Sequence, residues 1–270
     1  MPRDFPVLEL FSRIIAVLLN RVRVNRTMRG IRDGIPVIFK KRLWYAAGVI
    51  WLGNCFLKLS ESGVRMFVGA DEWLEWEVHC THLLYPDRFC TVCGQGKQIC
   101  IAEVRGMSLR QLVRRNEADL SVMAAAAGEV RRVHQLPCRV FEAGWSHGDL
   151  HLDNILYDRI TNRAFLIDFD TRHELRLNER RRHGDDLLVF LLELIACSDE
   201  KWFEWAMAFA EAYGESTVLQ ELAGRLSVPH GFAGILWSAR TQGASIQKME
   251  IRIERLRTAL RQIQSVTVTQ

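Results

Sequence analysis

The chain has 270 residues and a formal net charge of +4, with 49% hydrophobic and 25% charged residues. This composition excludes a disordered chain, and the length allows one large domain or two closely packed lobes. The mild positive charge is compatible with an anionic substrate or membrane surface, and by itself it does not indicate nucleic acid, so we expect no nucleic-acid partner. Seven cysteines, an odd number, indicate reduced thiols and a cytoplasmic protein.

Residues 5–19 are rich in apolar side chains that recur at helical spacing, which predicts an amphipathic helix. The stretch is too short and too charged to span a bilayer. Several arginines follow, up to Arg32. Two interpretations stay open: a helix packed on the first lobe, or a peripheral contact of residues 5–32 with the anionic inner face of the membrane.

A β-rich region follows. We expect a first strand at 37–43, and a hairpin of strands 48–52 and 55–59 around Gly53-Asn54. A helix is expected at 71–84, and further strands at 89–92 and 98–104.

The second half is mostly helical. The expected helices are 107–115, 118–134, 185–197, 200–213 and 245–265, with one strand pair, 155–157 and 164–167. The order predicts an α+β protein with a nucleotide cleft between a β-rich and an α-rich part. The expected divisions are an N-terminal extension (1–36), an N-lobe (37–105) and a C-lobe (106–270).

Two motifs carry the chemistry. Residues 147–156 read His-Gly-Asp-Leu-His-Leu-Asp-Asn-Ile-Leu, and residues 166–170 read Leu-Ile-Asp-Phe-Asp. Together they resemble the catalytic core of the protein-kinase-like superfamily, and most closely its bacterial branches, the lipopolysaccharide core kinases and the aminoglycoside-phosphotransferase-like kinases. The resemblance runs from about residue 37 to residue 200. It implies a bilobal fold, a β-rich N-lobe and an α-helical C-lobe, with ATP and Mg²⁺ bound between them.

The resemblance also implies residue roles. Asp149 takes the position of the catalytic base, which orients the acceptor hydroxyl and accepts its proton. Asn154 and Asp168 take the positions that hold magnesium, which prefers hard oxygen ligands. Gly148 stands where protein kinases carry arginine, and His151 stands where serine/threonine kinases generally carry lysine.

These departures favour a non-protein acceptor. We expect an ATP-dependent kinase that phosphorylates a hydroxyl group. The expected acceptor is a lipopolysaccharide-core-like sugar, as part of an anionic glycolipid, or another small molecule. A serine/threonine protein kinase and a pseudokinase that binds ATP without transfer remain as alternatives.

The phosphate-binding lysine has two candidates, Lys40 and Lys58. Glu77 lies 19 residues after Lys58 and 37 after Lys40. The shorter spacing leaves room for a loop and a few helical turns, so we predict that Lys58 contacts the phosphates and pairs with Glu77, with Glu72 as the alternative. The nucleotide loop is expected near residues 42–48, which lack the glycine-rich pattern.

Residues 101–109 resemble a kinase hinge, where backbone groups of Glu103 and Arg105 would bond the adenine. Asp186 is expected to bond back to the catalytic loop, with Asp185 as the alternative. Five arginines after Asp168 would suit a phosphate- or carboxylate-bearing acceptor: Arg172, Arg176, Arg180, Arg181 and Arg182. Cys90 and Cys93 lack a clearly spaced second pair for zinc, so buried free thiols are expected instead.

Overall fold

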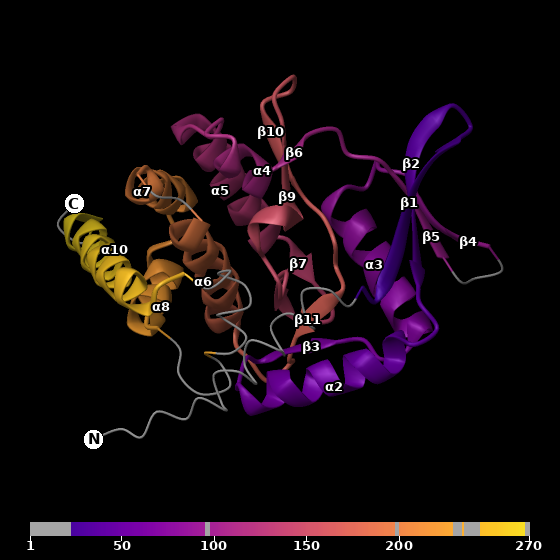
Figure 1. Ribbon diagram of the computed structural model, residues 1–270, viewed down its shortest axis with the longest axis horizontal. Coiled ribbons are helices and arrows are strands. Elements are labelled where there is room, and N and C mark those ends of the chain that lie inside the picture. Colours follow the sequence, from indigo (N-terminus) through magenta and orange to yellow (C-terminus); the bar gives the residue numbers. More distant parts are fainter. Residues whose placement is uncertain (1–22, 95–97, 198–199, 229–233, 235–243, 268–270) are drawn as a thin grey trace.

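The computed structural model describes residues 23–94, 98–197, 200–228, 234 and 244–267. A β-rich N-terminal part and a helical C-terminal part lie side by side (Figure 1), which confirms the predicted α+β class. The predicted helix at 5–19 lies outside the described residues. Among the described residues, no helix is long and apolar enough to cross a membrane.

The N-terminal part contains a four-stranded antiparallel sheet in the order β1-β2-β5-β4. Its strands are β1 (Asn25–Arg32), β2 (Ile35–Arg42), β4 (Cys90–Cys93) and β5 (Gln98–Ala102). Strand β1 lies in the stretch that we assigned to the extension. It joins β2 through Asp33-Gly34, whose positive φ angles of 51° and 78° suit a two-residue hairpin turn.

The expected hairpin at 48–59 is wrong, because these residues form one helix, α2 (Ala46–Leu59). Both residues of the supposed turn face β3 (Val64–Met66) from within this helix. The Asn54 side chain donates to the Met66 carbonyl (2.9 Å) and accepts from the Met66 N–H (2.8 Å). Gly53 is buried beside the Met66 side chain, where a Cβ would come within 2.5 Å of the Met66 Cε. Tertiary contacts therefore override the local turn signal.

Helix α3 (Ala70–Leu84) confirms the helix expected at 71–84. Asp71 and Glu72 lie in its first turn, where negative side chains favour the positive end of the helix dipole. The helix lies between the four-stranded sheet and the C-terminal part (Figure 1). Its buried face carries Trp73, Trp76 and Glu77, so it brings one carboxylate to the junction of the two parts.

The C-terminal part packs helices around a small sheet, β10-β9-β6. Its strands are β6 (Met107–Ser108), β9 (Ile155–Asp158) and β10 (Arg163–Leu166), and two-stranded pairs are formed by β7 (Pro137–Cys138) with β8 (Ala143–Gly144) and by β11 (Thr171–His173) with β3. Its helices are α4 (Leu109–Arg114), α5 (Leu120–His134), α6 (Glu179–Cys197), α7 (Trp202–Tyr213), α8 (Ser216–Arg225), α10 (Ile246–Thr267) and the short η1 (Leu152–Asn154).

Helix α6 begins six residues before the predicted start at 185. This places Asp185 and Asp186 in the interior of the helix rather than at its first turn. Apolar residues of α3, α5, α6 and α7 join the strands in one core, which includes the fully buried Trp73, Trp145, Phe190 and Phe209.

Candidate active site

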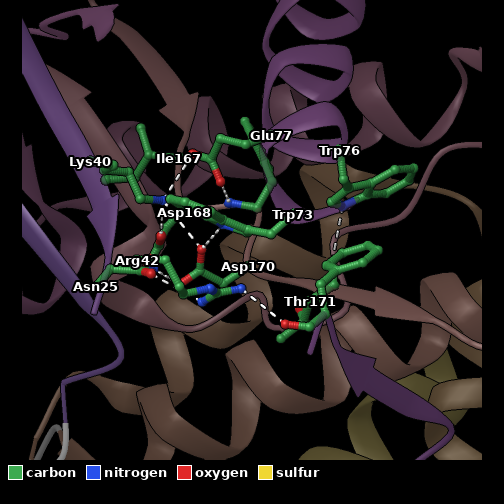
Figure 2. Close-up of polar contacts among 12 residues, drawn as sticks. Asn25, Lys40, Arg42, Trp73, Trp76, Glu77, Ile167, Asp168, Asp170 and Thr171 are labelled. Carbon is green, nitrogen blue, oxygen red and sulfur yellow. Dashed lines mark hydrogen bonds and ion pairs between the residues drawn. The ribbon is translucent and has the colours of Figure 1, made fainter. Parts of the chain in front are cut away.

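Lys40 lies at the centre of an ionic cluster where the two parts meet (Figure 2). Its Nζ is 2.9 Å from Glu77 Oε1 and 2.5 Å from Asp168 Oδ1. Strand β2 supplies the lysine, α3 the glutamate and the segment after β10 the aspartate. Glu77 Oε2 also accepts from the backbone N–H of Phe169 (3.1 Å), so α3 is tied directly to this segment.

The lysine that pairs with Glu77 is thus Lys40, and the predicted pairing of Lys58 with Glu77 is wrong. Lys58 lies exposed in the last turn of α2. The shorter spacing from Lys58 to Glu77 is misleading because residues 48–59 form a helix and not a hairpin. With α2 and β3 filling the 37 residues between Lys40 and Glu77, the longer spacing is the one that the chain uses. The alternative glutamate, Glu72, is exposed at the start of α3.

Asp170 is a further carboxylate of the cluster that we did not single out from the sequence. Its Oδ1 accepts from Trp73 Nε1 (2.6 Å) and lies 3.4 Å from Lys40 Nζ. Its Oδ2 accepts from Asn25 Nδ2 (2.5 Å). Asp170 therefore connects β1, β2 and α3 to the segment after β10, as Figure 2 shows. Its place in Leu-Ile-Asp-Phe-Asp was the only sequence signal, because its partners come from distant elements.

Arg42 is the second cation near the cluster. Its Nη1 donates to Asn25 Oδ1 (3.0 Å), its Nη2 donates to the Phe67 carbonyl (3.1 Å), and its guanidinium stacks 4.4 Å from the Trp73 ring. Residues 42–48, where we expected a nucleotide loop, instead connect β2 to α2 and begin that helix.

Burial and charge act in opposite directions on these groups. Burial alone would lower the pKa of Lys40, but the carboxylates, led by Asp168, outweigh it and hold that pKa well above its usual value. Burial raises the pKa of Asp168, yet Lys40 overcomes that effect, so the pKa of Asp168 is lowered. Burial raises the pKa of Glu77 despite Lys40, and burial together with Asp168 raises the pKa of Asp170. A lysine cation paired with an ionised Asp168 is the stable state at neutral pH.

The catalytic-loop motif lies against the same segment. The backbone N–H of Ile167 donates to the Asn154 carbonyl (3.0 Å), which brings the loop next to Asp168. The Asn154 amide Nδ2 donates to the Asp149 carbonyl (2.9 Å), so its amide oxygen is the remaining acceptor. Asp149 is partly exposed, and its Oδ2 lies 3.9 Å from His151 Nε2.

His147 orients this loop from inside. Burial lowers the pKa of His147, which favours the neutral imidazole. Its Nε2 lies 3.0 Å from the Ile167 carbonyl, and its Nδ1 accepts from the Asp149 N–H (3.3 Å). These two contacts require the tautomer that carries its proton on Nε2. One buried ring thus links the Asp149 segment to the Asp168 segment.

Asp186 makes the predicted bonds back to the loop. Its two carboxylate oxygens accept from the N–H groups of His147 (2.7 Å) and Gly148 (2.8 Å), and His134 Nε2 lies 3.1 Å from Oδ2. The alternative, Asp185, pairs with Arg225 instead. Burial raises the pKa of Asp186, but the surrounding histidines outweigh it and the pKa is lowered.

Two backbone conformations fix the approach of these segments. Gly148 has φ +86°, and a Cβ there would lie 3.0 Å from Thr171 Oγ1. Asp168 has φ 70°, in the left-handed region that non-glycine residues rarely adopt. Such residues concentrate at functional sites, where the surrounding contacts hold them in place.

The expected hinge joins β5 to β6. The Glu103 N–H donates to the Pro36 carbonyl (2.8 Å), so it is already used. The Glu103 carbonyl and the Arg105 N–H have no hydrogen-bond partner within the part of the chain that the structure describes. Gly106 follows with φ 137°. A separate hollow of about 660 Å³ lies between α5, α6 and α8, and none of its lining residues belongs to the Lys40 cluster.

The five arginines after Asp168 do not form one anion-binding stretch. Arg182 is buried, donates to the Leu177 and Gly144 carbonyls and stacks on Phe141. Arg172 stacks on Phe67 and Trp76, and Arg181 faces Asp185 and Glu221. Arg176, paired with Glu174, and Arg180 remain exposed.

The cysteine pair does not form a metal site. Within the described ranges, the grouping of metal-binding side chains is the acidic trio Glu77, Asp168 and Asp170, whose ligand atoms lie within 4.8 Å of one another. Cys90 is buried and Cys93 half-buried, and both are free thiols. The zinc alternative is therefore not supported; Cys90 is a buried free thiol as expected, whereas Cys93 is only half-buried.

Comparison with known proteins gives one family match. The profile of the phosphotransferase enzyme family matches residues 101–173, from β5 to β11 and through both motifs. No curated protein matches the chain. Among solved structures, an ethanolamine kinase of Plasmodium vivax is similar at 10% sequence identity, covering 94% of this chain and 89% of that one, with a TM-score of 0.41. A TM-score of this size carries no inference about function, and the family match supports a phosphotransferase without naming its branch.

Proposed function

We propose that the protein is an ATP-dependent kinase that transfers the γ-phosphate to a hydroxyl group. The observation that supports this most is the meeting of Lys40, Glu77 and Asp168 beside the loop that carries Asp149 and Asn154. Kinases of this kind use a lysine held by a helix glutamate, an aspartate and an asparagine for the metal, and a second aspartate for the acceptor. The family match over residues 101–173 points the same way.

Lys40 takes the role that we had given to Lys58. Its carboxylate partners keep it charged and hold its side chain at the junction, where it would contact the α- and β-phosphates. Glu77 is the positioning residue for Lys40, because its two oxygens bond the lysine and the Phe169 N–H at once. Glu77 would keep Lys40 in place if the lysine bonded phosphates instead of Asp168.

The residues also fit magnesium. Three carboxylates, from Glu77, Asp168 and Asp170, face the two cations Lys40 and Arg42, so the cluster carries an excess of negative charge when all are ionised. Asp168 and the amide oxygen of Asn154 are the hard ligands that would hold the ion. Bound magnesium would neutralise charge on the phosphates.

Asp149 is the base in this proposal. Its side chain is partly exposed, and its loop is fixed by Asp186, by His147 and by Asn154. The Asp149 carboxylate would orient the acceptor hydroxyl and accept its proton as the oxygen attacks the γ-phosphorus. For the adenine, the Glu103 carbonyl and the Arg105 N–H would serve as acceptor and donor.

The acceptor is assigned from the resemblance. A sugar hydroxyl on a lipopolysaccharide-core-like glycolipid, or another small molecule, suits the Asp-Leu-His sequence of residues 149–151 better than a protein does. We propose a cytoplasmic enzyme with peripheral contact to the inner membrane face through residues 5–32.

The acceptor class can be tested with γ-labelled ATP, magnesium and fractionated cell extract, using the Asp149→Asn variant as the control. The proposal predicts label in the lipid or small-molecule fraction, with the wild type only. Label in the protein fraction would show that the acceptor is a polypeptide instead. No transfer to any fraction, with ATP bound, would indicate a pseudokinase.

A further inference from the structure

Helix α2 exposes several large apolar side chains in addition to those that it buries. It lies along the outer edge of the molecule (Figure 1). It buries Ala46, Ile50 and Gly53, and Val49, Phe56 and Leu57 are half-buried beside them. On the opposite side of the helix, Trp51 is 63%, Leu52 53% and Leu59 59% exposed. A surface helix that packs on a core normally carries polar or charged residues on its outer side.

The exposed residues form one continuous face. At 100° per residue, Ala47, Gly48, Trp51, Leu52, Lys58 and Leu59 fall within an arc of about 140°, opposite the buried residues. Trp44 lies two residues before the helix and is 92% exposed, with the ring of Tyr45 packed against it edge-on at 5.5 Å. Single exposed apolar residues are normal, whereas a contiguous face of this kind marks a contact with a partner.

The charges around the face are positive. Residues 44–60 contain no acid, and their one charged side chain is Lys58. At the start of the helix, Tyr45 donates to the carbonyl of the exposed Arg23. At its side, the exposed Arg65 precedes Met66, which Asn54 bonds. The nearest acid along the chain is Glu61, just past the helix.

We propose that this face, the α2 face (Trp44, Trp51, Leu52, Leu59 and Lys58), binds the surface of an anionic lipid bilayer. Tryptophan and tyrosine rings favour the headgroup region, leucines enter the acyl boundary, and lysine and arginine remain at the anionic headgroups. A second copy fits less well, because a self-complementary contact would bring the basic residues of both copies together. The α2 face itself lies outside residues 5–32, although the neighbouring Arg23 belongs to that stretch, and the proposal does not depend on the kinase assignment.

The test uses the full chain and sedimentation with phosphatidylcholine vesicles, with and without about one quarter phosphatidylglycerol. We expect the wild type to bind the anionic vesicles, and the double variant Trp44→Ser/Trp51→Ser to bind them at least tenfold more weakly. Ile160→Ser is the matched control, because Ile160 is 85% exposed on the β9–β10 turn, away from α2, and its loss should leave binding unchanged. Lys58→Glu should weaken binding to anionic vesicles only.

Four outcomes would overturn the proposal. The first is a wild type that does not bind the vesicles. The second is a folded double variant, checked by circular dichroism, that binds as tightly as the wild type. The third is a wild-type dimer that the double variant converts to a monomer without any vesicle binding, which would assign the face to a second copy. The fourth is vesicle binding that appears only when residues 1–19 are deleted, which would show that this segment occupies the α2 face in the full chain.

Discussion

Replacing Lys40 by methionine tests which lysine serves the site, with Lys58→Met as the matched control. Both substitutions remove one ammonium and keep a long side chain. Lys40→Met removes the cation that bonds Glu77 and Asp168, so we expect kcat/KM for ATP to fall by about 10²- to 10³-fold, the size typical for losing one charged donor in an active site. Lys58→Met should change it less than about twofold, because Lys58 is exposed on α2.

Lys40→Met should also lower the free energy of unfolding. The Lys40 side chain is 9% exposed and that of Glu77 is 2%, so removing the lysine leaves a buried carboxylate without its cation. Breaking such a pair costs about 3–5 kcal/mol. We expect about 3 kcal/mol, because the raised pKa of Glu77 lets it take up a proton, and because Asp168, whose side chain is 42% exposed, is screened by water.

Urea denaturation of both variants and ATP turnover are the assays. Adding Glu77→Gln to Lys40→Met should recover part of the lost free energy of unfolding, since the neutral amide no longer needs a cation. If Lys58→Met abolished turnover while Lys40→Met kept it, the assignment of Lys40 would be refuted, whatever the stability data.

Three further predictions concern the same region. Asp170→Asn should lower the free energy of unfolding by about 1 kcal/mol, because an amide cannot accept from both Trp73 and Asn25, and unchanged urea denaturation would contradict this. Asp186→Ala should lower it by about 3 kcal/mol or more, since two buried N–H groups lose their acceptor, and a loss under 1 kcal/mol would show that the loop is held otherwise. Burial lowers the pKa of His173 to about 4 and that of His183 to about 3, so the unfolded chain binds protons that the folded chain does not, and stability should fall as the pH drops from about 6.5 towards 4. In urea denaturation at several pH values, the combined His173→Gln/His183→Gln variant should lose less free energy of unfolding than the wild type as the pH drops. An unchanged pH dependence would show that other groups cause it.

The catalytic loop was predictable because two short motifs, residues 147–156 and 166–170, carry the resemblance to the kinase-like superfamily. Asp149, Asn154 and Asp168 lie on two segments joined by one strand pair, so local order was enough to bring them together. Asp186 was predicted from the resemblance alone, because it lies inside α6 and its partners, the N–H groups of His147 and Gly148, are 39 and 38 residues away.

The N-terminal elements were harder to predict because the local turn signals were misleading. Gly53-Asn54 looked like a turn but lies inside α2, while the true turn, Asp33-Gly34, lies in an arginine-rich stretch that we took for an extension. This error moved the lysine from Lys40 to Lys58. The contacts of Asp170 join residues 97 and 145 positions apart, which no local pattern encodes.

The central claim is that Asp149 accepts the proton of a hydroxyl that attacks ATP. The most direct test compares the wild type with Asp149→Asn in γ-phosphate transfer, while nucleotide affinity is followed by calorimetry. We expect turnover to fall by about 10²- to 10⁴-fold with nucleotide affinity nearly unchanged. Equal turnover by the two proteins in the presence of acceptor would contradict the account.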